Sequence, residues 1–296
     1  MKYLQFILIL ILITACSGTK RVVNTQPKTA QNLEEVKDSI IEKTNPINEV
    51  VKQKQVDTLK TNKTVIKDIN TVEMIKQAPK TVTTFNHNNW DALLKKHVSN
   101  KGNVNYKAIN KNKAVLLNYI KSLGENMPTD AWDKKEKLAY WINAYNAMTI
   151  DLILRHYPLK SIKDIKNPWD QRYWKLGEKW YNLNEIEHDI LRKMDEPRIH
   201  FGIVCASYSC PKLLNEAFTA SNLEAQLTNV TKGFLADPER NIISENNIEI
   251  SKIFQWFAKD FKNNGSLIDF LNQYSTVKIS AKAKKTFKDY NWSLNE

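Results

Sequence analysis

The amino-acid sequence predicts an α+β fold, a helix-rich single globular domain with a few short strands, preceded by a disordered tether. All eight tryptophans lie between Trp90 and Trp292, so the large apolar side chains are confined to the C-terminal two-thirds of the 296 residues. Helical spacing dominates this part, and alternating patterns are few and short. Residues 17–84 contain no tryptophan or tyrosine, and therefore offer too little apolar surface to offset the entropy of ordering. The expected organisation is a signal peptide over 1–15, a flexible linker over 16–84 and a globular domain over 85–296.

The N-terminal segment has the pattern of an export signal that ends at a cysteine. Lys2 precedes an apolar run over residues 6–13, and small Ala15 stands directly before Cys16. The run is too short to remain as a transmembrane helix, which needs roughly 20 residues. The segment resembles a bacterial lipoprotein signal, so we expect palmitate-type lipidation of Cys16 and attachment to a membrane on the periplasmic side. Ser17 is compatible with the outer membrane; an ordinary signal peptide or an uncleaved anchor is the alternative.

Helical spacing predicts three helices in the first half of the domain, over residues 85–98, 114–122 and 132–156. The third has the clearest ends, since Asp130 is a plausible N-cap and Pro158 ends it. Its residues are apolar nearly all round, which indicates a buried helix. Two asparagines, Asn143 and Asn146, lie on one of its rows. We expect both to be buried and to need hydrogen-bond partners.

The second half of the domain is expected to mix short strands with short helices. Gly177 lies at the centre of a predicted hairpin over 173–181, and Asn182 or Asn184 caps a predicted helix over 183–194. Residues 198–204 alternate in polarity, so they are predicted to form a strand. The other expected elements are helices over 223–235, 253–261 and 267–274, and a hairpin over 242–250.

The formal net charge of +12 does not point to nucleic acid. An exported protein rarely meets nucleic acid, and no basic stripe with interleaved aromatic residues is present. The lysines are spread along the chain, which is typical of solvated faces. The expected partners are therefore the membrane, through the N-terminal lipid, and an envelope ligand or protein partner.

Several segments of the domain resemble the family catalogued as domain of unknown function 547. The resemblance extends over roughly residues 91–295, and the blocks follow the family's order. It implies a single domain with no agreed biochemical activity, often exported or lipid-anchored in bacteria. The segments that carry it are residues 139–147, 186–192, 198–211, 251–257 and 290–295.

The loop from Cys205 to Cys210 is the best candidate site. A thiol nucleophile needs a base within hydrogen-bond reach and usually a third group that orients the base. Either cysteine is a candidate nucleophile, and backbone N–H groups over 206–209 would bind an oxyanion. His200 and His188 are the candidate bases. The candidate orienting groups are Asn143, Asn146 and Glu187.

Other roles for the same loop remain open. In an oxidising compartment, Cys205 and Cys210 are expected to form a disulfide that would stabilise the loop by about 2 kcal/mol. A redox pair is a further alternative, although the spacing is not Cys-x-x-Cys. A zinc site that adds His188 and His200 has suitable ligand types but no standard spacing, so no metal and no cofactor are expected.

Four further residues are candidate ligand contacts. Ser207 and Ser209 carry hydroxyls in the loop, but no Gly-x-Ser-x-Gly elbow surrounds them. Arg192 and Arg198 flank the region and have the geometry to hold a carboxylate or phosphate; salt bridges with nearby acidic residues are the alternative. Together these observations favour a lipid-anchored envelope protein with a binding or scaffolding role centred on residues 200–211. The alternative is a thiol-dependent hydrolase or acyl-transferase.

Overall fold

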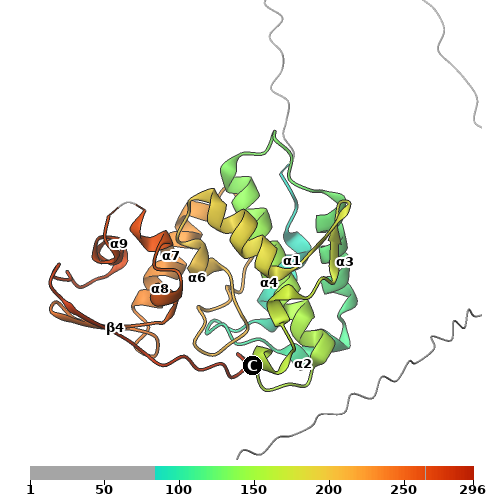
Figure 1. Ribbon diagram of the computed structural model, residues 1–296. Helices are drawn as coiled ribbons and strands as arrows, with labels where there is room; N and C mark the ends of the chain where they lie inside the picture. Colours follow the sequence, from blue (N-terminus) through green and yellow to red (C-terminus); the bar gives the residue numbers. More distant parts are fainter. Residues whose placement is uncertain (1–83, 264) are drawn as a thin grey trace, which may run out of the picture. The chain divides into compact units, whose positions relative to one another are not determined.

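The computed structural model describes residues 84–263 and 265–296, which form a helix-rich α+β fold with two small sheets (Figure 1). The expected signal peptide, Cys16 and nearly all of the expected linker lie outside the described residues. Within the described residues, no helix combines the length and hydropathy needed to cross a membrane.

The long helix α4, Lys134–His156, forms the centre of the fold. Every residue from Leu138 to Leu154 is buried, which confirms the prediction from its all-round apolar pattern. A capping box joins Asp133 and Glu136 at its start, so the N-cap is Asp133 and not Asp130. Three helices pack around this centre: α1 Asn88–His97, α2 Tyr106–Lys111 and α3 Ala114–Glu125. Of these, α2 was not predicted.

The predicted hairpin around Gly177 is confirmed as β1 Trp174–Leu176 and β2 Lys179–Tyr181. Gly177 has φ of 55°, a conformation that favours glycine. Its N–H donates to the carbonyl oxygen of Gly124 at 2.9 Å. A Cβ at Gly124 would lie 2.7 Å from the carbonyl oxygen of Lys175, so glycine lets α3 and the hairpin approach closely.

The predicted helix over 183–194 is present in three pieces. Asn182 caps α5, Leu183–Glu185, and a π-helical turn follows over Ile186–Ile190. A 3₁₀ turn, Leu191–Met194, then ends the segment. Because a π turn inserts an extra residue, it changes the directions in which the side chains of 187 and 188 project, and such turns are frequent at functional sites.

The predicted strand over 198–204 is wrong. Residues Ile199–Gly202 form the short helix α6, and all four are buried. The alternation of polarity therefore does not separate a buried face from an exposed one. No neighbouring strand pairs with this segment among the described residues, so its backbone groups bond locally, as from Ile203 N–H to Ile199 O at 2.9 Å.

The C-terminal third has a second apolar core of phenylalanine, leucine and isoleucine side chains. Helices α7 Leu223–Leu235 and α9 Leu267–Tyr274 match their predicted ranges. The predicted helix over 253–261 is shorter, since α8 covers Ile253–Trp256 and a separate turn covers Asp260–Lys262. The core includes the buried rings of Phe201, Phe234, Phe254, Phe261 and Phe270.

A three-stranded sheet lies beside this core, in the order β3-β4-β5. The expected hairpin is formed by β3 Ile242–Ile243 and β4 Asn247–Ile250, which are antiparallel. The third strand, β5 Lys284–Phe287, pairs with β4 in parallel and was not predicted. From this edge the chain returns toward residues 205–210 as an extended C-terminal tail, residues 290–295.

Candidate functional site

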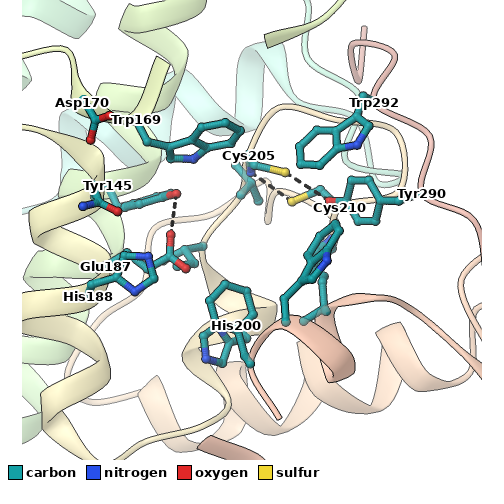
Figure 2. Close-up of a pocket in the computed structure, with 17 residues that line it drawn as sticks. Tyr145, Trp169, Asp170, Glu187, His188, His200, Cys205, Cys210, Tyr290 and Trp292 are labelled. Carbon is teal, nitrogen blue, oxygen red and sulfur yellow. Dashed lines mark hydrogen bonds between the residues drawn. The ribbon is translucent and has the colours of Figure 1, made fainter. Parts of the chain in front are cut away.

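A cavity of about 390 Å³ lies where the centre of the fold meets the C-terminal third (Figure 2). Helix α4 contributes Tyr145 to its wall, and the π-helical turn contributes Glu187 and His188. The segment after α6 contributes Cys205 and Cys210. Trp169, Trp256, Tyr290 and Trp292 add aromatic surface to the wall, which also includes the predicted base His200.

The two cysteines of the predicted loop lie together in the cavity wall as free thiols. The Cys205 N–H donates to Cys210 Sγ at 3.0 Å, and Ala206 between them has φ of 55°. Cys210 is buried, with 5 % of its surface exposed, whereas Cys205 is partly exposed. The two sulfurs are not joined to each other in the structure, so the 205–210 disulfide stays a prediction.

Hydroxyl groups surround the sulfur of Cys205. Tyr290 Oη lies 3.2 Å from Cys205 Sγ, and Ser207 Oγ lies 3.0 Å from it. The hydrogen bond from Cys210 lowers the pKa of the Cys205 thiol; burial opposes this, and the bonds from Ser207 and Tyr290 add to the lowering. Burial raises the pKa of the Cys210 thiol. The structure therefore distinguishes a thiolate-forming cysteine from a protonated neighbour.

The C-terminal tail holds this loop in place. Tyr208 N–H donates to Ser293 O at 2.7 Å, and Ser209 N–H donates to Asn291 O at 3.1 Å. The N–H groups of Tyr208 and Ser209 are therefore already hydrogen-bonded, and the prediction that they bind an oxyanion is wrong. The hydroxyl of Ser209 is also bonded to the tail, since Ser209 Oγ accepts from Asn291 N–H at 2.9 Å.

Glu187 places a buried carboxyl group at the opposite side of the cavity from the sulfurs (Figure 2). Only 7 % of its surface is exposed, and Tyr145 Oη donates to its Oε2 at 3.0 Å. Burial raises the pKa of Glu187 to about 7, although the bond from Tyr145 acts in the opposite direction. The group thus exchanges a proton near neutral pH at the cavity wall.

The two candidate bases belong to a network around Asp260, not to the thiols. His200 Nε2 donates to Asp260 Oδ2 at 2.8 Å, and Arg192 donates to both Asp260 oxygens at 2.6 and 2.8 Å. Arg192 also donates to His188 Nδ1 at 2.6 Å. Burial lowers the pKa of both histidines, so both favour the neutral form. Among the described residues, neither imidazole hydrogen-bonds a cysteine sulfur.

Asn143 and Asn146 are buried as predicted, and neither lines the cavity. Asn143 accepts from Trp90 Nε1 and bonds the backbone of Phe218 in both directions. Asn146 donates to Gly202 O at 2.8 Å and accepts from Val204 N–H at 2.9 Å. Both amides therefore tie α4 to other segments, and Asn146 fixes the residue just before Cys205.

Arg198 lies away from this cavity. It pairs with Glu196 and Glu224 and donates to Thr228 Oγ1. Arg198 and Arg192 therefore both form salt bridges, which was the alternative to a ligand role. The partner of Arg192 is Asp260. Arg198 does not line the cavity around Cys205; it lines a separate pocket of about 260 Å³ together with its partners Glu196 and Glu224.

Sequence reasoning missed Trp256, Tyr290 and Trp292 in the cavity wall, and Asp260 as the partner of Arg192 and His200. Tyr290 and Trp292 are 4.5 Å apart between ring centroids, and Trp256 lies 4.8 Å from Tyr290. Trp169 packs edge-on against Trp292 at 6.0 Å. The available signal was the resemblance of residues 251–257 and 290–295 to family blocks, which marked these segments without indicating that they meet.

The predicted zinc alternative is not supported by the side-chain positions. In residues 84–263 and 265–296, no group of three or more histidine, cysteine, aspartate or glutamate side chains is placed to hold a metal ion. Cys205 and Cys210 have hydroxyl and thiol neighbours, whereas His188 and His200 are joined to Arg192 and Asp260.

Comparison with known proteins places a domain of one family in this chain. Residues 129–235 match the model of the family described as "Protein of unknown function, DUF547", so a domain of unknown function is present. The matched range includes α4, the π-helical turn and both cysteines. No curated protein matches the chain. No solved structure matches it either.

Proposed function

We propose that this chain is a lipid-anchored envelope protein whose domain binds a small ligand in the cavity around Cys205. One observation carries the proposal: six aromatic side chains and several ionisable groups line one cavity of about 390 Å³. This volume lies within the usual range of small-molecule sites, and such sites combine apolar walls with a few polar groups. Among these ionisable groups, Glu187 has a raised pKa and Cys205 a lowered one.

The wall favours a ligand with a flat apolar face. Trp256 is 45 % exposed and stacks on Trp292 at 5.8 Å, so large aromatic surfaces are available without any rearrangement of the core. Sugar rings and aromatic rings both present faces of this kind. In an envelope protein, a saccharide fragment is the class we favour, with Glu187 as its hydrogen-bond partner.

A titration of the full chain with the disaccharide of N-acetylglucosamine tests the proposal. We expect saturable heat of binding in calorimetry, weakened about 10-fold by Trp256→Ala, the equivalent of about 1.4 kcal/mol. Trp180→Ala is the matched control, because Trp180 is similarly exposed but lies on β2 outside the cavity. No saturable binding, or equal weakening by both variants, overturns the proposal.

A second candidate function is a thiol-dependent hydrolase or acyl-transferase. The lowered pKa of Cys205 favours it, because a thiolate is the nucleophilic form. Cys205 would attack an ester carbonyl, form a thioester and release the alcohol. With p-nitrophenyl acetate, this function predicts a burst of about one p-nitrophenolate per chain followed by turnover, both lost in Cys205→Ser. A burst that persists in Cys205→Ser excludes it.

The proposed anchor is the lipid on Cys16, with the domain outside the cytosol. The carrying observation is the run of residues 6–15 before that cysteine. Metabolic labelling with radioactive palmitate should mark the chain and should fail in Cys16→Ser. An unlabelled chain recovered among soluble cell contents contradicts the anchor.

A further inference from the structure

We infer that Cys205 and Cys210 form a redox pair that exchanges with a low-molecular-weight disulfide held in the cavity. The inference rests on the proposed function in one respect, since it takes the cavity as the ligand site. It adds the chemistry of the site and the class of the substrate.

The placement of the two sulfurs separates their roles. Both line the cavity, so a disulfide between them is open to a small molecule and is not enclosed in the core. Cys205 is partly exposed, whereas Cys210 is buried directly behind it, within 3.0 Å of the Cys205 N–H. An incoming disulfide therefore meets Cys205 first, and Cys210 is positioned to attack the mixed disulfide.

The surroundings of Cys205 stabilise the thiolate that reduction produces. When the sulfur is ionised it has no proton to give, so Tyr290 O–H donates to it across the 3.2 Å contact. Ser207 Oγ is within 3.0 Å of the sulfur and 2.9 Å of Tyr290 Oη, so its proton reaches either group. Stabilising the reduced form makes a disulfide easier to reduce, which distinguishes a redox-active pair from a structural one.

The shift in pKa agrees with this placement. The hydrogen bond from Cys210, with those of Ser207 and Tyr290, lowers the pKa of Cys205, and burial raises that of Cys210. In dithiol proteins, the attacking thiol usually has a pKa near ambient pH. The second thiol, which resolves the mixed disulfide, stays protonated.

The exchange balances in two steps. The Cys205 thiolate attacks one sulfur of the bound disulfide, RSSR′, which forms Cys205–S–S–R and releases R′S⁻. The Cys210 thiol then gives its proton to R′S⁻ and, as a thiolate, attacks Cys205 Sγ, which releases RS⁻. RS⁻ takes up from solvent the proton that Cys205 lost when it ionised. The two electrons pass from the protein to the small disulfide, and the products are the 205–210 disulfide and two small thiols. A small dithiol runs both steps in reverse.

Equilibration of the full chain with mixtures of reduced and oxidised glutathione tests the inference. The fraction of crosslinked chain is read by alkylation and mass mapping. We expect the crosslink to form and break reversibly across these mixtures. Cys210→Ser should trap glutathione on Cys205, and Cys205→Ser should trap much less on Cys210, because that sulfur is buried.

Two conservative variants test the thiolate-stabilising contacts. Ser207→Ala and Tyr290→Phe should each shift the equilibrium several-fold toward the crosslinked form, since the thiolate loses a hydrogen bond in each. Ser209→Ala is the matched control, because its hydroxyl lies in the same loop and bonds Asn291, not sulfur. Circular dichroism establishes that each variant is folded.

Three results overturn the inference: a crosslink that persists in every mixture, equal glutathione trapping on both cysteines, or no shift with Tyr290→Phe and Ser207→Ala. Each is distinct from failure of ligand binding. If the disaccharide binds in a way that depends on Trp256 but no thiol–disulfide exchange occurs, only the redox role is refuted. Exchange without disaccharide binding refutes the saccharide ligand alone.

Discussion

The side chain of Asn146 accepts the backbone N–H of Val204 at 2.9 Å, one residue before Cys205. Its amide nitrogen donates to Gly202 O at 2.8 Å, so both ends of the amide are used. The central helix α4 thus fixes the segment that enters the cavity. Asn143, one turn earlier, makes the equivalent contacts to Phe218, which does not line the cavity.

This relationship predicts a difference between two asparagine variants. Asn146→Ala and Asn143→Ala each leave buried backbone groups unpaired, so each should lower the free energy of unfolding in urea by about 2–4 kcal/mol. Only Asn146→Ala should also change the alkylation rate of Cys205. Asn118→Ala, at an exposed position of α3, is the control and should stay within about 0.5 kcal/mol of the unchanged protein. Equal thiol reactivity in both buried variants would contradict the role given to Asn146.

Asp260 is predicted to hold the network beside the cavity. Asp260→Asn removes the charge that pairs with Arg192 and accepts from His200 Nε2, and should lower the free energy of unfolding at pH 7 by about 2–3 kcal/mol. Burial raises the pKa of Asp260, but the bonds from Arg192 and His200 outweigh it and lower that pKa below its ordinary value.

A carboxyl with a lowered folded pKa stabilises the fold above its unfolded pKa of about 4, and this stabilisation falls as the pH decreases. The difference between Asp260→Asn and the unchanged protein should therefore shrink between pH 7 and pH 3. Asp189→Asn provides the comparison, since the Asp189–Lys193 pair is exposed and should contribute less than about 1 kcal/mol. A constant difference across this range would rule out Asp260 as the ionised partner.

The helices and the hairpin that were predicted correctly from the sequence are those that depend on residues close together in the chain. The pattern of α4 repeats over many turns, and the hairpin needs only Gly177 between two short aromatic runs. By contrast, β5 carries three exposed residues of four, so its sequence lacks the alternation that marks a half-buried strand. The segment forms a strand because it pairs with the edge of β4, which is a tertiary contact.

The same distinction applies to the site. The cysteines, Glu187 and His188 lie in segments whose composition attracted attention, and the structure brings them to one cavity. The partner of Arg192 was sought among acidic residues nearby in sequence, whereas the structure uses Asp260, 68 residues away. Tyr290 reaches Cys205 across 85 residues for the same reason. A single sequence contains no signal for such pairs, because they depend on how the second core docks.

Glu187 is predicted to make the stability of the domain fall with increasing pH. Its folded pKa is about 7, raised mainly by burial, whereas an unfolded glutamate titrates near 4.3. Between these values the folded protein keeps a proton that the unfolded chain has lost, so the free energy of unfolding decreases as pH rises. The full effect, at most about 4 kcal/mol, is reached above pH 7.

Glu187→Gln should remove this decrease, because the amide stays neutral and still accepts from Tyr145. Urea denaturation at pH 5 and pH 8 measures it. Glu178→Gln is the control, since the Glu178 side chain is fully exposed and the change should stay within about 0.5 kcal/mol at either pH. If the free energy of unfolding of Glu187→Gln decreases with pH as steeply as that of the unchanged protein, Glu187 is not the group that causes the decrease.

The thiol of Cys205 is predicted to react at lower pH than an ordinary cysteine. Alkylation by iodoacetamide depends on the thiolate fraction, so the rate in the reduced protein should reach half its maximum below the ordinary pKa of about 8.5. Cys210→Ala should move this midpoint upward most, because the bond from Cys210 is the largest cause of the lowered pKa. Tyr290→Phe should move it less, since Ser207 remains beside the sulfur. Ser209→Ala should leave it in place. A midpoint that none of these changes moves would mean that the reactivity of Cys205 has another origin than its hydrogen bonds.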